Sequence, residues 1–156
     1  MNIYDMTLSD LENYFETMGE KKYKAKQIYD WLYKKRVTNF DEMSNVKKTV
    51  IQKLQSDFKI TKPKIIKVQH AKDVHKYLFE LDDSNKIEAV LMNHDYGNSL
   101  CVSTEVGCNM GCAFCESGRL KKIRNLTAGE MVSQILLVES DLNIRISHVV
   151  LMGIGE

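Results

Sequence analysis

The first third of the chain carries apolar residues at the spacing of short amphipathic helices. Thr7 or Ser9 can cap a first helix, because an acidic residue follows three positions after each, and Gly19 ends it. Residues 24–36 predict a second helix, and a third is expected to begin near Ser44. The apolar positions of these helices predict a helical core made of Leu8, Leu11, Phe15, Met18, Ala25, Ile28, Trp31, Leu32, Val46, Val50, Leu54 and Phe58.

The pattern changes at Pro63, the only proline. Residues 65–71, 75–81 and 87–92 are short segments rich in Val, Ile, Tyr and Phe, and the turn sequence DDSNK separates the second from the third. This arrangement predicts a small antiparallel sheet with a hairpin, followed by a loop at 94–98.

The last part of the chain predicts a strand, a long loop, a helix and another strand. The strand LCVST precedes a cysteine-containing loop, and the helix after it begins with a capping box formed by Thr127 and Glu130. Met131, Ile135 and Val138 form the apolar stripe of this helix. The continuous apolar run SHVVLMG is typical of a strand buried on both faces. A βαβ unit implies a parallel sheet.

The expected fold class is therefore α/β in the last part and α+β overall. We expect a helical accessory domain at 1–62, a small antiparallel segment and connector at 63–98, and the first βαβ part of an α/β core at 99–156. No internal repeat interrupts this partition.

Composition places the chain among ordinary globular proteins, with 44% hydrophobic and 28% charged residues. The sequence has no apolar run of about 18 residues and no secretory signal pattern at its start, so we expect a cytoplasmic protein with no membrane span. Charge is uneven: 14 Lys/Arg and four acids lie between Lys21 and Lys67, a balance of +10, and the remainder carries −9. A polyanionic partner and a solvated lysine-rich surface both explain the basic region.

Three cysteines, Cys108, Cys112 and Cys115, stand in the spacing CxxxCxxC. Structural zinc takes four protein ligands, and no cysteine follows Cys115, so His94 or His148 would have to supply the fourth. A ferredoxin-type cluster also takes four cysteines. A 4Fe-4S cluster held by three cysteines leaves one iron open, to which the nitrogen and oxygen donors of an amino acid can bind.

This spacing, with Phe114 immediately before the third cysteine, resembles the radical S-adenosylmethionine (SAM) enzymes. The resemblance implies that the three cysteines hold a 4Fe-4S cluster and that Phe114 lies near the SAM adenine. The segment Gly153-Ile154-Gly155-Glu156 is similar to the element that approaches the SAM amino group in that superfamily. Taken alone, Phe114 fits simple loop packing, and the GxGE segment fits a strand-to-helix turn.

A closer resemblance covers essentially the whole chain. The bacterial adenine-carbon-2 RNA methyltransferases of the RlmN type have runs similar to KAKQIYDWLYKKRVTNFDEM, LCVSTEVGCNMGCAFC, RNLTAGEMVSQI and HVVLMGIGE. Their carbon-8 relatives share the core motifs. The resemblance implies methylation of adenosine in 23S rRNA and tRNA with a 4Fe-4S cluster and two SAM molecules. It also implies an electron donor such as flavodoxin or ferredoxin, and a monomer at full length.

Two further site residues follow from this resemblance. Glu88 matches a carboxylate implicated in proton transfer, and Cys101 matches a cysteine that resolves a covalent enzyme–RNA adduct. Without the resemblance, Glu88 would be a solvent-facing strand residue and Cys101 a buried strand thiol. In the family, a methylated cysteine near the C-terminus loses a hydrogen to a 5′-deoxyadenosyl radical, and the resulting carbon radical adds to adenine.

The sequence departs from the family pattern in three respects. No cysteine follows Cys115 to carry the methyl group, and only 57 residues run from Leu100 to Glu156, against about 200 for a complete α/β barrel. Glu105 stands where the family usually has Gln. We therefore expect a fragment that does not methylate by itself. The alternatives are a non-catalytic basic RNA-binding module and a zinc-stabilised interaction domain.

Overall fold

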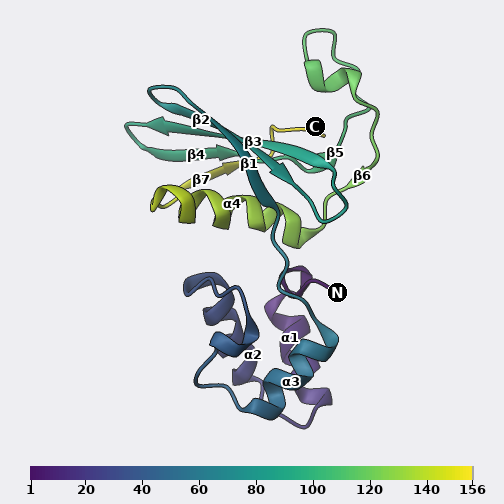
Figure 1. The fold of residues 1–156 in the computed structure, drawn as a ribbon, viewed down its shortest axis with the longest axis vertical. Coiled ribbons are helices and arrows are strands. Elements are labelled where there is room, and N and C mark those ends of the chain that lie inside the picture. The colour runs from purple at the N-terminus through teal and green to yellow at the C-terminus, as the bar shows by residue number, and fades with distance from the viewer. Residues whose placement is uncertain (156) are drawn as a thin grey trace. The chain divides into compact units, whose positions relative to one another are not determined.

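A computed structural model describes residues 1–155 and shows two compact units, Met1–Thr61 and Lys62–Glu156. The first unit is helical, and the second is built on a mixed sheet with one long helix (Figure 1). The expected class of mixed helices and sheet is thus confirmed. No helix within the described residues is both long and apolar enough to span a lipid bilayer.

The helical unit contains three α-helices. They are α1 (Leu8–Thr17), α2 (Tyr23–Tyr29) and α3 (Lys48–Asp57). Helix α1 begins at the predicted capping box, in which the Thr7 hydroxyl oxygen accepts from Asp10 N at 3.1 Å and the Asp10 carboxylate accepts from Thr7 N at 2.9 Å. Gly19, with φ at 71°, turns the chain after the helix.

Two helix boundaries differ from the prediction. Helix α2 continues as a π-helical turn, η2 (Asp30–Lys34), and α3 begins at Lys48 rather than near Ser44. Before α3, Val46 N donates to Met43 O at 3.0 Å in a turn, and Lys47 is extended, so the helix cannot begin at Ser44. Further upstream, Asn39 and Glu42 form a separate capping box around the short 3-10 helix η3 (Phe40–Glu42). Another short 3-10 helix, η1 (Ile3–Asp5), precedes α1.

Trp31 lies in the core of the helical unit, as predicted. Its side chain is buried, and the indole nitrogen donates to Asn45 Oδ1 at 2.7 Å, which satisfies the only polar group of the ring. Most of the other predicted apolar positions are buried too, so the helical spacing identified this core correctly. Those that are buried are Leu11, Phe15, Ala25, Ile28, Leu32, Val50, Leu54 and Phe58.

The second unit is organised around a five-stranded sheet in the order β1-β2-β3-β4-β7. The strands are β1 (Lys64–His70), β2 (Val74–Glu80), β3 (Lys86–His94), β4 (Gly97–Cys101) and β7 (His148–Val150). Neighbours from β1 to β4 are antiparallel, whereas β4 and β7 are parallel and are joined through α4 (Ala128–Leu142). Segments 63–98 and 99–156 therefore contribute strands to a single sheet.

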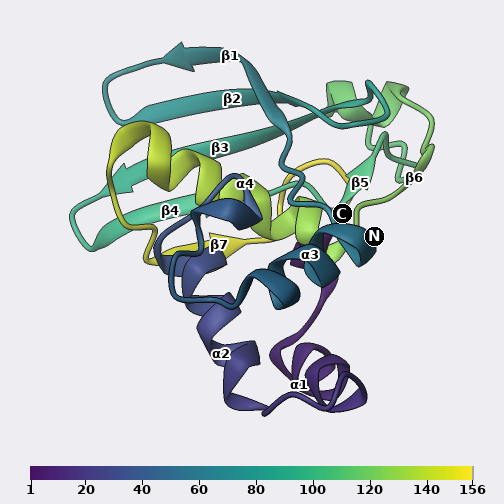
Figure 2. The ribbon, with the colours of Figure 1, turned by 60° about the horizontal axis from the view of Figure 1, so that its bottom comes forward.

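The sheet has one covered face and one open face, because successive side chains of a strand point to opposite sides. Helix α4 lies along the covered face (Figures 1 and 2). It packs Met131, Ile135 and Val138 against the apolar face of the sheet. That face consists of Tyr77, Phe79, Ile87, Ala89, Leu91, Leu100 and Val102. The opposite face carries the residues that concern function.

Strand β7 is more exposed than the apolar run predicted. Val149 of β7 is 46% exposed, and Leu151 and Met152, which directly follow the strand, are 56% and 63% exposed, although the sequence indicated a strand buried on both faces. The difference arises because β7 pairs with β4 alone and forms the edge of the described sheet.

Candidate functional site

A cavity of about 220 Å³ lies on the open face of the sheet. Its lining includes Glu88 from β3, Cys101 from β4, Cys115 from the cysteine loop and Gly153 from the segment after β7. These four residues come from segments that are distant in the sequence, and each had been predicted as a site residue. The fold thus brings part of the expected site together around one hollow.

The cysteine loop lies between two short paired strands, β5 (Glu105–Val106) and β6 (Arg124–Asn125), and contains the 3-10 helix η4 (Glu116–Arg119). Figure 1 shows this loop in green, projecting beyond β5 and β6. Its two arms are held together where Cys108 N donates to Leu120 O at 2.9 Å. Gly107 is required at this closure, because its φ is 70° and a Cβ there would lie 2.0 Å from Lys121 O.

The thiols of the loop match the donor set of an iron–sulfur cluster. Cys108 is buried and accepts a hydrogen bond from Met110 N at 3.4 Å, while Cys112 and Cys115 are half-buried. Cys115 N also donates to Cys112 O at 3.1 Å, so the last two cysteines share one turn. Soft thiolates of this kind are the usual ligands of Fe–S clusters.

The side chains of these cysteines do not converge in this conformation. Among residues 1–155, no group of three or more His, Cys, Asp or Glu side chains is arranged to hold a metal ion. The four cysteines form no disulfide with one another. The donor chemistry therefore fits a cluster, and its binding would require rotation of the thiols toward a common centre.

The segment after β7 runs directly against the backbone that follows β4. Gly153 N donates to Val102 O at 3.1 Å, and a Cβ on Gly153 would lie 2.7 Å from backbone atoms of Val102 and Ser103. Ile154 O accepts from Thr104 N at 3.0 Å. Glycine is needed here because two backbones approach more closely than a side chain permits. Glu156, the predicted SAM contact, lies outside the described residues.

A buried polar network that the sequence reasoning missed supports the site. The Ser103 hydroxyl donates to Glu88 O at 2.6 Å and accepts from Ile154 N at 3.0 Å. The Gln134 side chain bonds both the N and the O of Ser103, each at 3.0 Å. Ser103 and Gln134 are fully buried, so they fix β3, α4 and the 153–155 segment to one another. The sequence feature that could have indicated this network is the polar Gln134, next to Ile135 of the predicted apolar stripe.

The remaining predicted residues have different surroundings. Glu88 forms an ion pair with Lys76 at 2.9 Å across β2 and β3. Phe114 is 94% exposed and is not part of the cavity lining. Glu105, which replaces the usual Gln, forms an ion pair with Lys122 at the base of the cysteine loop.

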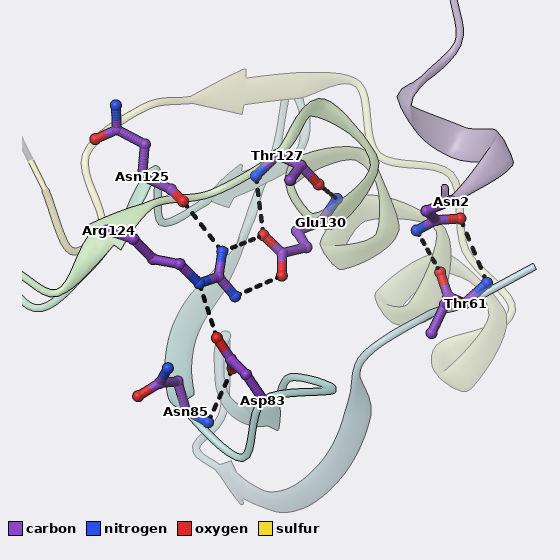
Figure 3. A network of polar contacts seen from close by, with 8 residues as sticks. All are labelled: Asn2, Thr61, Asp83, Asn85, Arg124, Asn125, Thr127 and Glu130. Carbon is purple, nitrogen blue, oxygen red and sulfur yellow. Dashed lines mark hydrogen bonds and ion pairs between the residues drawn. The ribbon is translucent and has the colours of Figure 1, made fainter. Parts of the chain in front are cut away.

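An arginine network anchors the far end of the cysteine loop (Figure 3). Arg124 on β6 donates to Asp83 in the β2–β3 turn at 2.8 Å and binds the Glu130 carboxylate through two hydrogen bonds of 2.8 Å. Hydrogen bonding to Arg124 lowers the pKa of Asp83 to about 2. Burial acts to raise the pKa of Glu130, but hydrogen bonds from Arg124 and Thr127 outweigh it, and that pKa is also lowered.

Comparison with known proteins gives one consistent answer. Residues 1–60 match the family described as the ribosomal RNA large subunit methyltransferase N-terminal domain. The chain is 52% identical to a probable dual-specificity RNA methyltransferase RlmN from Enterococcus faecalis, over 99% of this chain and 45% of the relative. A Listeria monocytogenes protein with the same name is 50% identical, over 99% of this chain and 44% of the relative.

Residues 1–60 thus match the N-terminal domain of the RlmN family, and the chain as a whole is similar to the N-terminal part of RlmN-type RNA methyltransferases. It spans less than half the length of the curated relatives it matches. The fold agrees with the crystal structure of a radical SAM methyltransferase from Sphaerobacter thermophilus, with a TM-score of 0.87 and 34% identity over 100% of this chain and 47% of that chain. The RlmN resemblance inferred from the motifs is thereby confirmed, and the roles of single residues remain predictions.

Proposed function

We propose that this chain is the N-terminal part of a radical SAM RNA methyltransferase that modifies carbon 2 of adenosine in 23S rRNA and tRNA. The observation that carries this proposal is the cavity shared by Glu88, Cys101, Cys115 and Gly153. Four chain segments supply one predicted residue each to the same hollow. Relatives named as dual-specificity RNA methyltransferases support the choice of substrate.

Cys108, Cys112 and Cys115 would hold the 4Fe-4S cluster through their thiolates. When bound, the cluster supplies the electron that splits SAM. The backbone of Gly153 and Gly155, with Glu156, would bind the amino group of SAM, and Phe114 would turn toward its adenine. A flavodoxin or ferredoxin in the cytoplasm is the proposed source of the electron, and the full-length protein is proposed to be a monomer.

Glu88 and Cys101 are the groups of this chain that would act on the RNA base. Glu88 would accept or return a proton at its carboxylate, and the Cys101 thiol would attack the covalent link that joins enzyme to RNA. Both line the cavity from adjacent strands. Methyl transfer by these residues alone is not expected, because no cysteine follows Cys115 to carry the methyl group.

Anaerobic reconstitution with iron and sulfide tests the cluster directly. We expect a brown protein with about four irons per chain and an EPR signal after reduction. Cys112→Ala should lose the colour and signal, whereas the matched control Cys101→Ala should keep both, because Cys101 is a thiol outside the ligand set. A colourless wild-type protein that binds one zinc ion would contradict the proposal.

The basic balance of residues 21–67 favours a second candidate, a non-catalytic RNA-binding module. Under this reading, salt-dependent binding to structured rRNA would persist after all three motif cysteines are replaced, and no cluster would form in the wild type. Iron analysis and RNA binding of the same preparations separate the two functions.

A further inference from the structure

A second cavity, of about 270 Å³, adjoins the first on the open face of the sheet. It is lined by Lys67 and Gln69 of β1, Lys76 and Leu78 of β2, and Glu88 of β3. Lys76 and Glu88 line both cavities, so their ion pair stands at the boundary between them. The neighbouring hollow therefore shares two lining residues with the proposed reaction site.

The polar lining of this second cavity consists mainly of hydrogen-bond donors. Strand pairing sets Gln69 opposite Lys76, and alternation along β1 places Lys67 on the same face as Gln69. Lys67 forms no ion pair with any described residue, and Glu88 is the only acid in the lining. Two ammonium groups and an amide facing one carboxylate leave a site that favours an anion.

We propose that this cavity binds a phosphodiester of the RNA strand next to the target adenosine, and that Lys76 leaves Glu88 for the phosphate when the strand enters. The proposal rests on the proposed function, because it takes the adjoining cavity as the place of the base. Lys76 acts here as a positioning residue. It holds the strand in register, and its departure frees the Glu88 carboxylate to face the base.

The exchange of partners is physically easy. The side chains of Lys76 and Glu88 are 43% and 37% exposed, and an ion pair this open to water contributes little net stability. The flexible lysine stem lets one ammonium reach either anion, and ammonium groups bind phosphates as point charges. Releasing the counterions of the RNA adds a favourable, salt-dependent contribution.

Fluorescence anisotropy of the full 156-residue chain with a labelled RNA hairpin that presents an unpaired adenosine tests the proposal. Lys76→Met and Lys67→Met should each weaken binding by about tenfold and reduce the slope of log affinity against log salt by about 1. The matched control is Lys86→Met. Lys86 lies on β3, on the same face of the sheet as Glu88, but it forms its ion pair with Glu80 outside the cavity.

Lys76→Arg separates positioning from structural support, because it keeps the charge and should retain most of the affinity and the full salt slope. Equal binding by Lys76→Met, Lys67→Met and Lys86→Met would overturn the subsite. Wild-type protein that binds no RNA would overturn it too. The cluster proposal is judged independently by iron content and EPR, so failure of the subsite is distinguishable from failure of the proposed function.

Discussion

At the scale of single residues, close backbone contacts and one buried hydroxyl define the site. Gly107 and Gly153 stand where another segment's backbone leaves no room for a Cβ. Ser103 connects Glu88 to Ile154 through its hydroxyl. The glycines were visible in the motifs, but no sequence pattern indicated that Ser103 would join three elements. These residues hold the predicted catalytic groups in place without acting on a substrate.

Ser103→Ala is expected to destabilise the sheet unit by about 1–3 kcal/mol, because it removes the hydroxyl that bonds the part-buried carbonyl of Glu88 and the buried N–H of Ile154. Urea unfolding followed by far-UV circular dichroism measures the change in the free energy of unfolding. Ser133→Ala is the matched control: Ser133 is equally buried, but its hydroxyl has no partner among the described residues, so its loss should be neutral or slightly stabilising. Equal costs for both variants would contradict this account.

At the scale of elements, two devices position the cysteine loop. The Ser103–Gln134 hydrogen bonds join α4 to the backbone after β4, and Arg124 joins β6 to the β2–β3 turn and the start of α4. Glu130 takes part in two of these contacts, because its carboxylate accepts from Thr127 N in the capping box of α4 and also binds Arg124. The residue that marks the start of the helix in the sequence, Glu130, therefore also makes a tertiary contact.

The Arg124 network predicts a pH dependence of stability. Because the folded-state pKa of Asp83 is lowered to about 2, its contribution is present above its ordinary pKa of 3.8 and is lost as the pH falls through 2. We expect wild-type stability to fall more steeply than that of Asp83→Asn between these values, by less than about 1 kcal/mol because the pair is partly exposed. The measurement is chemical unfolding at stepped pH.

Asp82→Asn provides the control for this prediction. Asp82 is an exposed acid in the same turn and forms no ion pair with a described residue. It should follow the wild-type pH profile. An Asp83→Asn profile that is identical to that of Asp82→Asn would show that the Arg124 contact contributes nothing to acid sensitivity.

At the scale of the whole molecule, charge and exposure differ between the two units. The basic balance of +10 lies between Lys21 and Lys67, mostly in the helical unit, and the rest of the chain carries −9. The sheet unit exposes apolar side chains at its β7 edge, namely Val149, Leu151 and Met152. An open edge strand with exposed apolar residues is a site of unwanted pairing.

A polypeptide of these 156 residues is therefore expected to self-associate in a concentration-dependent way. Light scattering coupled to size-exclusion chromatography measures its mass. Val149→Lys, which puts a charge on the edge strand, should shift the population toward monomer, whereas Val74→Lys, at an exposed position of β2 away from that edge, should not. A monomeric wild-type chain with a sharp cooperative unfolding transition would contradict this prediction.

The sequence predicted much of the fold because the decisive signals are local. Thr7 with Asp10 and Thr127 with Glu130 mark helix starts, and both capping boxes form. The third helix begins later than expected, because residues 43–46 form a turn and Lys47 is extended. The exposure of β7 was missed, since an apolar run does not reveal whether a strand has neighbours on both sides.

By itself, the sequence determined the cysteine spacing, the glycines, the βαβ order and the resemblance to the RlmN-type enzymes, because these are properties of residue identity and separation. Only the tertiary structure decided that Glu88, Cys101, Cys115 and Gly153 line one cavity and that Phe114 does not. It also decided that Ser103 and Gln134 support that cavity and that Lys76 faces Glu88. These relations depend on strand register and on contacts between distant segments, which pairing and packing set only when the chain folds.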